Sequence, residues 1–253
     1  MEIRYIKHYS HSLQRDMEFK VYGHTGKPVM FIPCQQGRFW DFESFHMIDY
    51  WAKWIEAGLV TVYSVDCIDG EAYADLHGDP RRRSEQHDRW YHYVVDEFVP
   101  TIQGMNRERT GRDDMIMVFG CSMGAMHAGN LFFRRPDLFD CVLALSGMYD
   151  PHTFFPGYVD NILYENSPNL YLANMPNDHY YIDMYNHRRG IICVGQGAWE
   201  DDLKASTFWL RDVLAAKNIH GVKVEVWGHD VNHDWPWWYR QVELYVPQLL
   251  GLN

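Results

Sequence analysis

The chain has 253 residues, of which 47% are hydrophobic and 23% charged, and these values fit one ordinary globular domain. Its 34 acidic residues outnumber its 23 basic ones, so the net charge of −11 argues against a nucleic acid or an anionic membrane as partner. The 5 cysteines are an odd number without CxxC spacing, which argues against a disulfide framework or a zinc ribbon and favours a reducing compartment. Since the sequence also starts without an apolar leader, we expect a cytoplasmic protein.

The first quarter of the chain contains strand and helix patterns in close succession. Residues 2–9 and 17–24 alternate between apolar and polar, which predicts an antiparallel hairpin at one edge of a sheet. The continuous apolar run 28–33 is typical of a strand covered on both faces. Residues 40–57 have apolar positions at helical spacing, and residues 59–65 form a second apolar run. We therefore expect a strand, a helix and a strand after the hairpin.

The middle of the chain continues this alternation. Residues 84–99 are expected to form a helix that ends at Pro100. Residues 115–119 are a third buried strand by their composition, and residues 123–133 follow it as a helix. Another core strand is predicted at 141–145. This order is typical of parallel strands joined by helices.

The last third contains two more predicted strands, 191–194 and 222–226, each followed by a predicted helix, at 205–217 and 237–250. Strand–helix alternation with short connections predicts the α/β class, with a mostly parallel sheet and helices on both faces. We expect one domain over residues 1–253. The segment 148–188 has no sustained period and is too long for an ordinary connection, so we expect it to cap a site.

The clearest chemical motif is a G-x-S-x-G, the sequence GCSMG at Gly120–Gly124. It lies between a predicted strand and a predicted helix, where a nucleophilic serine stands on a sharp turn with its hydroxyl exposed. The glycines avoid collisions with neighbouring backbone, and the helix N-terminus directs free N–H groups at the reacting oxygen. The motif predicts Ser122 as a nucleophile.

A serine nucleophile requires a base, and the loop after strand 222–226 contains two histidines. We favour His233 over His229 because His233 precedes the last helix and is followed by bulky rings that can fix its orientation. The spacing of the two histidines superficially resembles a zinc site, but their loop setting and the lack of a third ligand argue against a metal.

An acid that orients the base is expected between the serine and the histidine in this architecture. The loop after strand 191–194 ends in three acidic residues. Glu200 is our first choice for the acid and Asp201 the second, while Asp202 is more simply explained as charge at a helix start. The order Ser122, Glu200, His233 matches the order of roles in a hydrolase.

These motifs resemble the putative-esterase family of α/β-hydrolases, which includes esterase D-like enzymes, feruloyl esterases, enterochelin esterases and the mycolyltransferase antigens. The resemblance covers nearly the whole chain and rests on four segments, which are FIP with GRF at 31–39, GCSMG at 120–124, GQGAWE at 195–200 and HDWPWW at 233–238. It implies an α/β-hydrolase fold, and it strengthens His233 because the family's base lies in an H-x-W segment. One departure is Asn232, where a glycine is common in the family.

The resemblance also implies an oxyanion hole built from two main-chain N–H groups. Carried over, these belong to Met123 and to a residue of the CQQ turn, Gln35 or Gln36. The chain is then expected to be a serine esterase that forms an acyl-enzyme, with a small-molecule ester as its partner and with no metal or organic cofactor.

Two alternatives stay open from the sequence. An acyltransferase would use the same three residues and pass the acyl group to an alcohol or amine. A non-catalytic binding protein would keep only the scaffold. The aromatic segment 148–188 could shape an acyl pocket or form a dimer contact, so a homo-oligomer also stays open.

Overall fold

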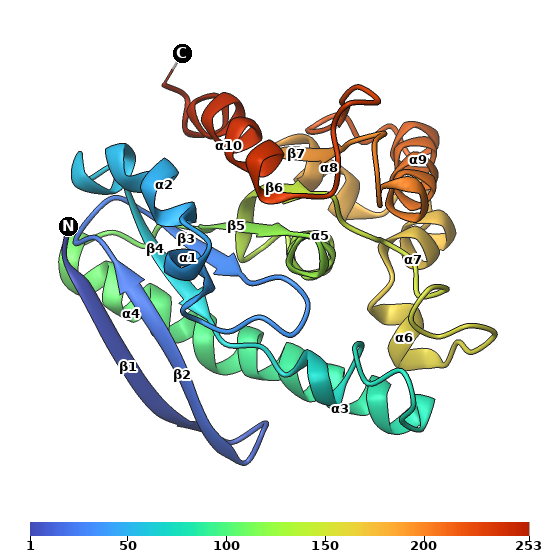
Figure 1. Cartoon of the computed structure of the whole chain (residues 1–253), viewed down its shortest axis with the longest axis horizontal. Helices are drawn as coiled ribbons and strands as arrows, with labels where there is room; N and C mark the ends of the chain where they lie inside the picture. The colour runs from blue at the N-terminus through green and yellow to red at the C-terminus, as the bar shows by residue number, and fades with distance from the viewer. Residues whose placement is uncertain (253) are drawn as a thin grey trace. The chain divides into compact units, whose positions relative to one another are not determined.

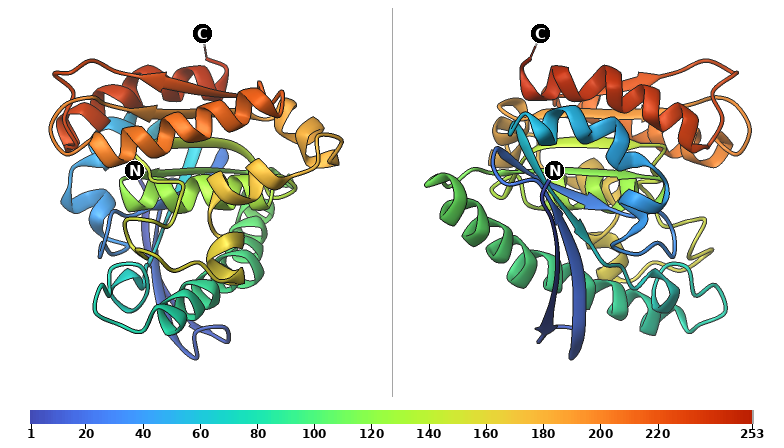
Figure 2. Two further views of the ribbon diagram at one scale, coloured as in Figure 1. Left: turned by 90° about the vertical axis from the view of Figure 1, so that its right-hand side faces the viewer. Right: turned by 60° about the vertical axis from the view of Figure 1, so that its left-hand side comes forward.

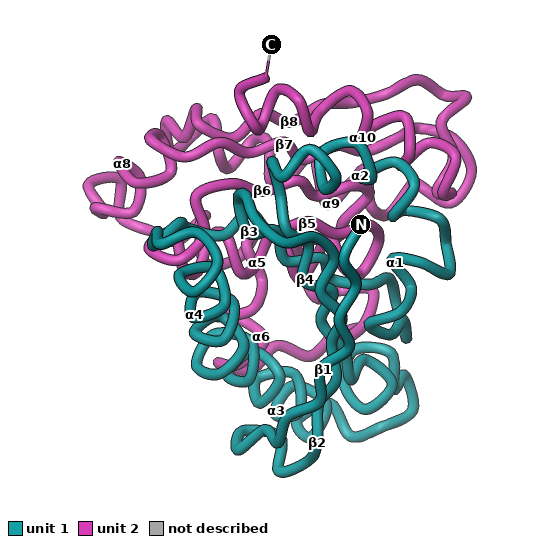
Figure 3. Tube along the Cα trace, turned by 90° about the vertical axis from the view of Figure 1, so that its left-hand side faces the viewer, with its two compact units in different colours: residues 1–117 teal, residues 118–253 magenta. Residues whose placement is uncertain are grey.

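Residues 1–252 are described by the computed structural model, and they fall into two compact units divided between Met117 and Val118 (Figure 3). The strands are β1 (Ile3–Ser10), β2 (Arg15–Tyr22), β3 (Lys27–Ile32), β4 (Val60–Val65), β5 (Ile116–Cys121), β6 (Phe139–Leu145), β7 (Arg189–Val194) and β8 (Val222–Val226). Their order in the sheet is β1-β2-β4-β3-β5-β6-β7-β8.

Helices connect most of these strands (Figure 1). The α-helices are α1 (Asp41–Ser44), α2 (Met47–Glu56), α3 (Pro80–His92), α4 (Val99–Thr110), α5 (Met123–Arg134), α6 (Asn161–Glu165), α7 (Pro168–Asn174), α8 (Tyr180–Asn186), α9 (Asp201–Ala216) and α10 (Trp235–Leu250). A 3-10 turn, η1 (Asp69–Glu71), and a π-helical turn, η2 (Tyr93–Phe98), complete the list. No helix among residues 1–252 combines the length and apolar character needed to cross a membrane.

The first unit contains the antiparallel edge of the sheet. β1 pairs with β2 from Ile3 opposite Tyr22 to Ser10 opposite Arg15, and β2 pairs antiparallel with β4. β3 and β4 are parallel and almost wholly buried, as their continuous apolar composition predicts. α2 packs on β4 and α4 on β3. The expected antiparallel N-terminal edge is confirmed.

The helix expected at 84–99 is longer at both ends, so the prediction that Pro100 closes it was wrong. It begins at Pro80, where the Asp79 side chain accepts a hydrogen bond from the N–H of Arg82 at 2.9 Å. It then continues through η2 into α4 and ends before Gly111. Pro100 is the second residue of α4, one residue after the π-helical turn, where the regular hydrogen-bond ladder is already altered and the missing N–H of proline costs less.

The second unit contains the parallel part of the sheet. β6, β7 and β8 are parallel neighbours, with Cys141 opposite Arg189 and Gly190 opposite Val222. α5 packs on β6, α9 packs on β7, and α10 packs on both strands. Figure 1 shows α10 on one side of these strands and α5 and α9 on the other. The α/β class with a mostly parallel, helix-covered sheet is confirmed.

The segment 148–188 is irregular only in part, because it contains the short helices α6, α7 and α8 (yellow to light orange in Figure 2). Buried polar groups fix it to the helices beside it. Asn130 of α5 donates to the Asn166 side chain at 2.8 Å, and the N–H of Tyr149 donates to Ser206 of α9 at 2.8 Å. The segment is thus anchored within the second unit, and its role as a cap stays a prediction.

Two glycines allow a test of the first unit. Gly26 has a φ of +99°, and a Cβ there would lie 2.3 Å from the carbonyl carbon of Leu59. We expect Gly26→Ala to lower the free energy of unfolding by more than about 2 kcal/mol, because backbone atoms cannot make room cheaply. In α4, by contrast, a Cβ on Gly104 would meet nothing within 4 Å, so Gly104→Ala should raise that free energy by about 0.5–1 kcal/mol. Urea denaturation measures both values, and equal effects would contradict this packing.

Candidate active site

The serine of the G-x-S-x-G motif lies on a strained turn between β5 and α5. Ser122 has φ 57° and ψ −126°, a conformation that costs a non-glycine residue of order 1–3 kcal/mol. A Cβ on Gly120 would lie 2.3 Å from the backbone of Gly124, which explains why the turn needs glycine there. The N–H of Ser122 donates to the carbonyl of Leu145 at 2.9 Å and fixes the turn to β6. The serine hydroxyl is thereby held clear of the strand.

The hydroxyl of Ser122 lies within hydrogen-bond distance of the favoured histidine. Nε2 of His233 is 2.9 Å from Oγ of Ser122, although the two residues are 111 positions apart in the chain. His233 lies in the loop between β8 and α10, and its ring meets the ring of Trp238 edge-on, with centroids 5.0 Å apart. His229, in the same loop, is exposed and has no hydrogen-bond partner among residues 1–252. Of the two histidines, the structure brings only His233 to the serine.

The first choice for the acid lies behind the histidine. Glu200 is fully buried, and its Oε1 is 3.5 Å from Nδ1 of His233. This distance is longer than an ordinary hydrogen bond, and Nδ1 of His233 has no hydrogen-bond partner among residues 1–252. Asp201 is exposed and pairs with Lys204 at 2.9 Å, and Asp202 is exposed as well. The structure therefore brings Glu200, and neither aspartate, to the imidazole.

Hydrogen bonds between two loops set the positions of the acid and the histidine. The N–H of Gly197 donates to the carbonyl of Val231 at 2.8 Å, and the N–H of His233 donates to the carbonyl of Ala198 at 3.0 Å. The N–H of Ala198 donates to the side chain of Asn232 at 2.8 Å. These bonds join the loop after β7 to the loop after β8, so Glu200 and His233 are fixed by one shared framework.

Two glycines allow these loops to approach closely. A Cβ on Gly195 would lie 2.3 Å from the carbonyl oxygen of Val231, and a Cβ on Gly197 would lie 2.3 Å from Oδ1 of Asn232. The close packing of the two loops therefore requires glycine at both ends of the GQG sequence. Asn232 stands where a glycine is common in the family that the sequence resembles. Its side-chain oxygen accepts the hydrogen bond from the N–H of Ala198 in the opposite loop.

Sequence reasoning missed one polar neighbour of the acid. The hydroxyl of Ser146 is 2.6 Å from Oε1 of Glu200, and the indole nitrogen of Trp238 is 3.1 Å from the same hydroxyl. Ser146 directly follows β6, and its only sequence signal was a polar residue at the end of a core strand. Trp238 is one of the bulky rings expected to fix the orientation of His233, and the donor role of its N–H could not be read from its spacing.

The surroundings of Glu200 are otherwise neutral. Burial raises the pKa of the Tyr149 phenol far above its usual range, and the nearby Cys193 and Glu200 add to this effect. Burial likewise raises the pKa of the Cys193 thiol, with a smaller contribution from Glu200. Both groups stay protonated at neutral pH. Neither group therefore places a negative charge beside Glu200.

The main-chain groups expected to form an oxyanion hole lie in two separate turns. Met123 is the first residue of α5, so its N–H has no acceptor within the helix. Gln35 and Gln36 are exposed in a turn closed by a 2.8 Å hydrogen bond from Gly37 to Cys34, and Gln36 has a φ of 57°. Neither glutamine N–H is hydrogen-bonded within residues 1–252. Each turn by itself thus offers a free donor.

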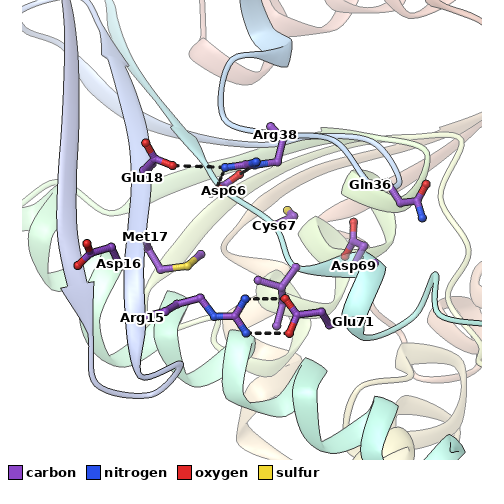
Figure 4. A pocket seen from close by; sticks show the side chains of 12 residues that line it. Arg15, Asp16, Met17, Glu18, Gln36, Arg38, Asp66, Cys67, Asp69 and Glu71 are labelled. Atoms are coloured by element: carbon purple, nitrogen blue, oxygen red, sulfur yellow. Dashed lines mark hydrogen bonds and ion pairs between the residues drawn. The ribbon is translucent and has the colours of Figure 1, made fainter. Parts of the chain in front are cut away.

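Gln36 also lines a pocket of about 360 Å³ in the first unit (Figure 4). Arg15 and Glu71 form a two-pronged ion pair across it, and Arg38 pairs with Asp66 at 2.6 Å. Burial raises the pKa of the Asp66 carboxyl, and the Arg38 guanidinium opposes this rise. The side chains that line the pocket include two arginines and five acids, Asp16, Glu18, Asp66, Asp69 and Glu71. Both guanidinium groups are already paired, so the lining is unfavourable for an anionic ligand.

Comparisons with known proteins identify the family of the chain. The model of the family described as Putative esterase matches residues 10–247. A search of curated proteins found no match.

Solved structures share the fold across nearly their whole lengths. A ferulic acid esterase aligns with a TM-score of 0.74 and 15% identity, covering 100% of this chain and 99% of that one. An S-formylglutathione hydrolase from Agrobacterium tumefaciens gives 0.68 and 15%, covering 99% and 93%. MPT51 from Mycobacterium tuberculosis gives 0.74 and 13%, covering 99% and 98%. At these identities the likeness concerns the fold, and it confirms the expected α/β-hydrolase architecture.

The contact between the two loops can be tested at Asn232. Asn232→Ala removes the acceptor of the Ala198 N–H, and we expect it to lower the free energy of unfolding by about 1 kcal/mol. Asn232→Asp keeps an oxygen acceptor at the same place and should lose less. Urea denaturation followed by circular dichroism measures the difference. Equal stability of the wild type and the alanine variant would show that the side-chain bond contributes nothing.

Proposed function

The chain belongs to the Putative esterase family and is a hydrolase that acts on esters, and we propose that it cleaves carboxylic esters with Ser122 as its nucleophile. The observation that carries this proposal is the 2.9 Å distance between Oγ of Ser122 and Nε2 of His233, with the Glu200 carboxylate on the far side of the ring. A serine is reactive only when a base takes its proton and a third group orients that base. Ser122 and His233 lie within hydrogen-bond distance, and Oε1 of Glu200 lies 3.5 Å from the other ring nitrogen of His233.

In the proposed mechanism, Oγ of Ser122 attacks the ester carbonyl while Nε2 of His233 takes the hydroxyl proton. Glu200 holds the proton on Nδ1, which leaves Nε2 free to accept, and it stabilises the imidazolium that forms. The tetrahedral intermediate collapses when His233 gives its proton to the leaving alcohol, leaving an acyl-enzyme. Water then attacks the acyl carbon, gives a proton to His233 and releases the acid as Ser122 regains its hydrogen.

The negative oxygen of the tetrahedral intermediate needs donors aimed at it. We propose that the N–H of Met123 is one donor, supported by its position at the positive end of α5. The second would come from Gln35 or Gln36, whose N–H groups have no hydrogen-bond partner within residues 1–252 and lie in an exposed turn. The left-handed conformation of Gln36 supports this role, because strained backbone is retained where surrounding structure or function requires it.

The family and the fold neighbours favour hydrolysis over acyl transfer. Their named activities nevertheless differ, since one is a ferulic acid esterase and another an S-formylglutathione hydrolase. We propose a small-molecule ester as substrate, and a panel of acetyl, butyryl and feruloyl esters with a thioester would identify the acyl preference. A cytoplasmic location stays a prediction from the cysteine usage.

The nucleophile and the base have a direct test with p-nitrophenyl acetate. We expect Ser122→Ala and His233→Ala each to lower kcat/KM by about 10⁴-fold or more, since the members of such a triad act as a unit. His229→Ala is the matched control from the same loop and should stay within about twofold of wild type, because the His229 side chain is exposed. An inactive His229→Ala beside an active His233→Ala would reverse the assignment of the base.

The acid can be tested in the same assay. Glu200→Gln keeps the shape of the side chain but removes the charge facing the imidazole, and we expect kcat to fall by about 10³–10⁴-fold. Asp201→Asn removes only an exposed ion pair with Lys204 and should leave kcat within about twofold. If the aspartate variant were the inactive one, Glu200 would not be the acid.

A further inference from the structure

Ser146 has a backbone conformation that a serine adopts at a cost. It directly follows β6, is 1% exposed, and has a φ of 56°, in the left-handed region that favours glycine. Its N–H donates to the carbonyl of Cys193 at 2.7 Å, so the backbone is fixed from the neighbouring strand. A glycine would satisfy the same backbone without strain. What serine adds at this position is its hydroxyl.

The direction of the hydrogen bonds through this hydroxyl is fixed by chemistry. The indole N–H of Trp238 can only donate, so Oγ of Ser146 accepts from it at 3.1 Å. A carboxylate can only accept, so the hydroxyl proton of Ser146 points at Oε1 of Glu200, 2.6 Å away. The two hydrogen bonds therefore run in one direction, from the N–H of Trp238 to Oγ of Ser146 and from the hydroxyl of Ser146 to Oε1 of Glu200.

The carboxylate of Glu200 depends strongly on this donor. It is fully buried, and its Oε2 has no hydrogen-bond partner among residues 1–252. The other oxygen, Oε1, faces both the Ser146 hydroxyl at 2.6 Å and Nδ1 of His233 at 3.5 Å. Of these two contacts, the shorter one is to the serine. A buried charge with so few partners is costly unless each of them is kept.

Trp238 connects both sides of this arrangement. Its N–H holds Ser146, while its ring packs at 90° against the ring of His233. The same side chain of α10 thus limits the movement of the histidine and fixes the serine that holds the acid.

We propose that Ser146, held by Trp238, is a positioning residue for ester hydrolysis. It orients Oε1 of Glu200 toward Nδ1 of His233, which leaves Nε2 of the imidazole ready to accept the proton of Ser122. This inference rests on the proposed function, because it assigns Ser146 a role in the same reaction.

The first test is Ser146→Ala with p-nitrophenyl acetate. We expect kcat to fall by about 10- to 100-fold, the size of one lost hydrogen bond to a buried charge, with KM within about twofold. The rate of labelling by a fluorophosphonate should fall by a similar factor, because labelling also depends on activation of Ser122. Ser206→Ala is the matched control, since Ser206 is buried in the same unit and accepts from Tyr149 and Asn169. It should lower the melting temperature but leave kcat within about twofold.

A second variant separates positioning from simple structural support. Ser146→Gly relieves the left-handed backbone and removes the hydroxyl, so we expect the melting temperature to hold or rise while kcat falls as in the alanine variant. It also serves if the alanine variant fails to fold. Wild-type kcat in Ser146→Gly would mean that position 146 only supports the turn, and the proposal would be overturned.

The donor upstream of the serine has its own variant. Trp238→Phe keeps an aromatic ring against His233 but removes the N–H, and we expect a smaller fall in kcat, about two- to fivefold. Combined with Ser146→Ala it should add little, because both changes break one chain of hydrogen bonds. Fully additive losses would show that the two residues act independently, which contradicts the chain.

The labelling experiment separates the two levels of the argument. If the wild type and Ser122→Ala were equally unlabelled by the fluorophosphonate, the proposed function itself would fail. If the wild type is labelled and Ser146→Ala and Ser146→Gly are labelled at the wild-type rate, only the positioning role of Ser146 is wrong.

Discussion

The proposed active site depends on the hydrogen bonds that join the loop after β7 to the loop after β8. One loop ends in Glu200 and the other in His233, and main-chain groups of Gly197, Ala198 and His233 bind them to each other. Because backbone atoms make most of these contacts, the distance between acid and base is set by rigid groups and not by flexible side chains. A change that moves one loop should therefore move the proposed acid and base together.

Two serines, Ser122 and Ser146, complete the proposed site. Ser122 is presented by its strained turn at the end of β5, and Ser146 follows the end of β6, also with a positive φ. Both backbone conformations cost free energy that the surrounding strands offset through the carbonyls of Leu145 and Cys193. Buried polar groups interact strongly because the local dielectric constant is low. The hydrogen bonds from Trp238 to Ser146 and from Ser146 to Glu200 therefore have a larger effect than they would at the surface.

Local patterns predicted much of the fold and the site. Apolar runs located β3 through β8, and the G-x-S-x-G motif identified the turn that carries Ser122, because a nucleophile elbow is defined by neighbouring residues. The helix expected to stop at Pro100 was wrong, since the π-helical turn before it depends on packing that periodicity does not report. The hydrogen-bonding roles of Ser146 and Asn232 were not predicted, for another reason. Their partners, Glu200 and Ala198, lie 54 and 34 positions away, and no short-range spacing indicates such a contact.

The turn that carries Gln35 and Gln36 also contains Cys34, whose thiol pKa is raised by burial and by the nearby charges of Asp41 and Asp69. Oxidants and alkylating reagents attack the thiolate, and this cysteine forms very little of it at neutral pH. Cys121, which precedes the proposed nucleophile, is fully buried. A sulfur atom therefore lies next to each of the two turns proposed to bind the oxyanion. Cys34 is partly exposed and Cys121 is buried, so the low thiolate content of Cys34 should slow its reaction with alkylating reagents.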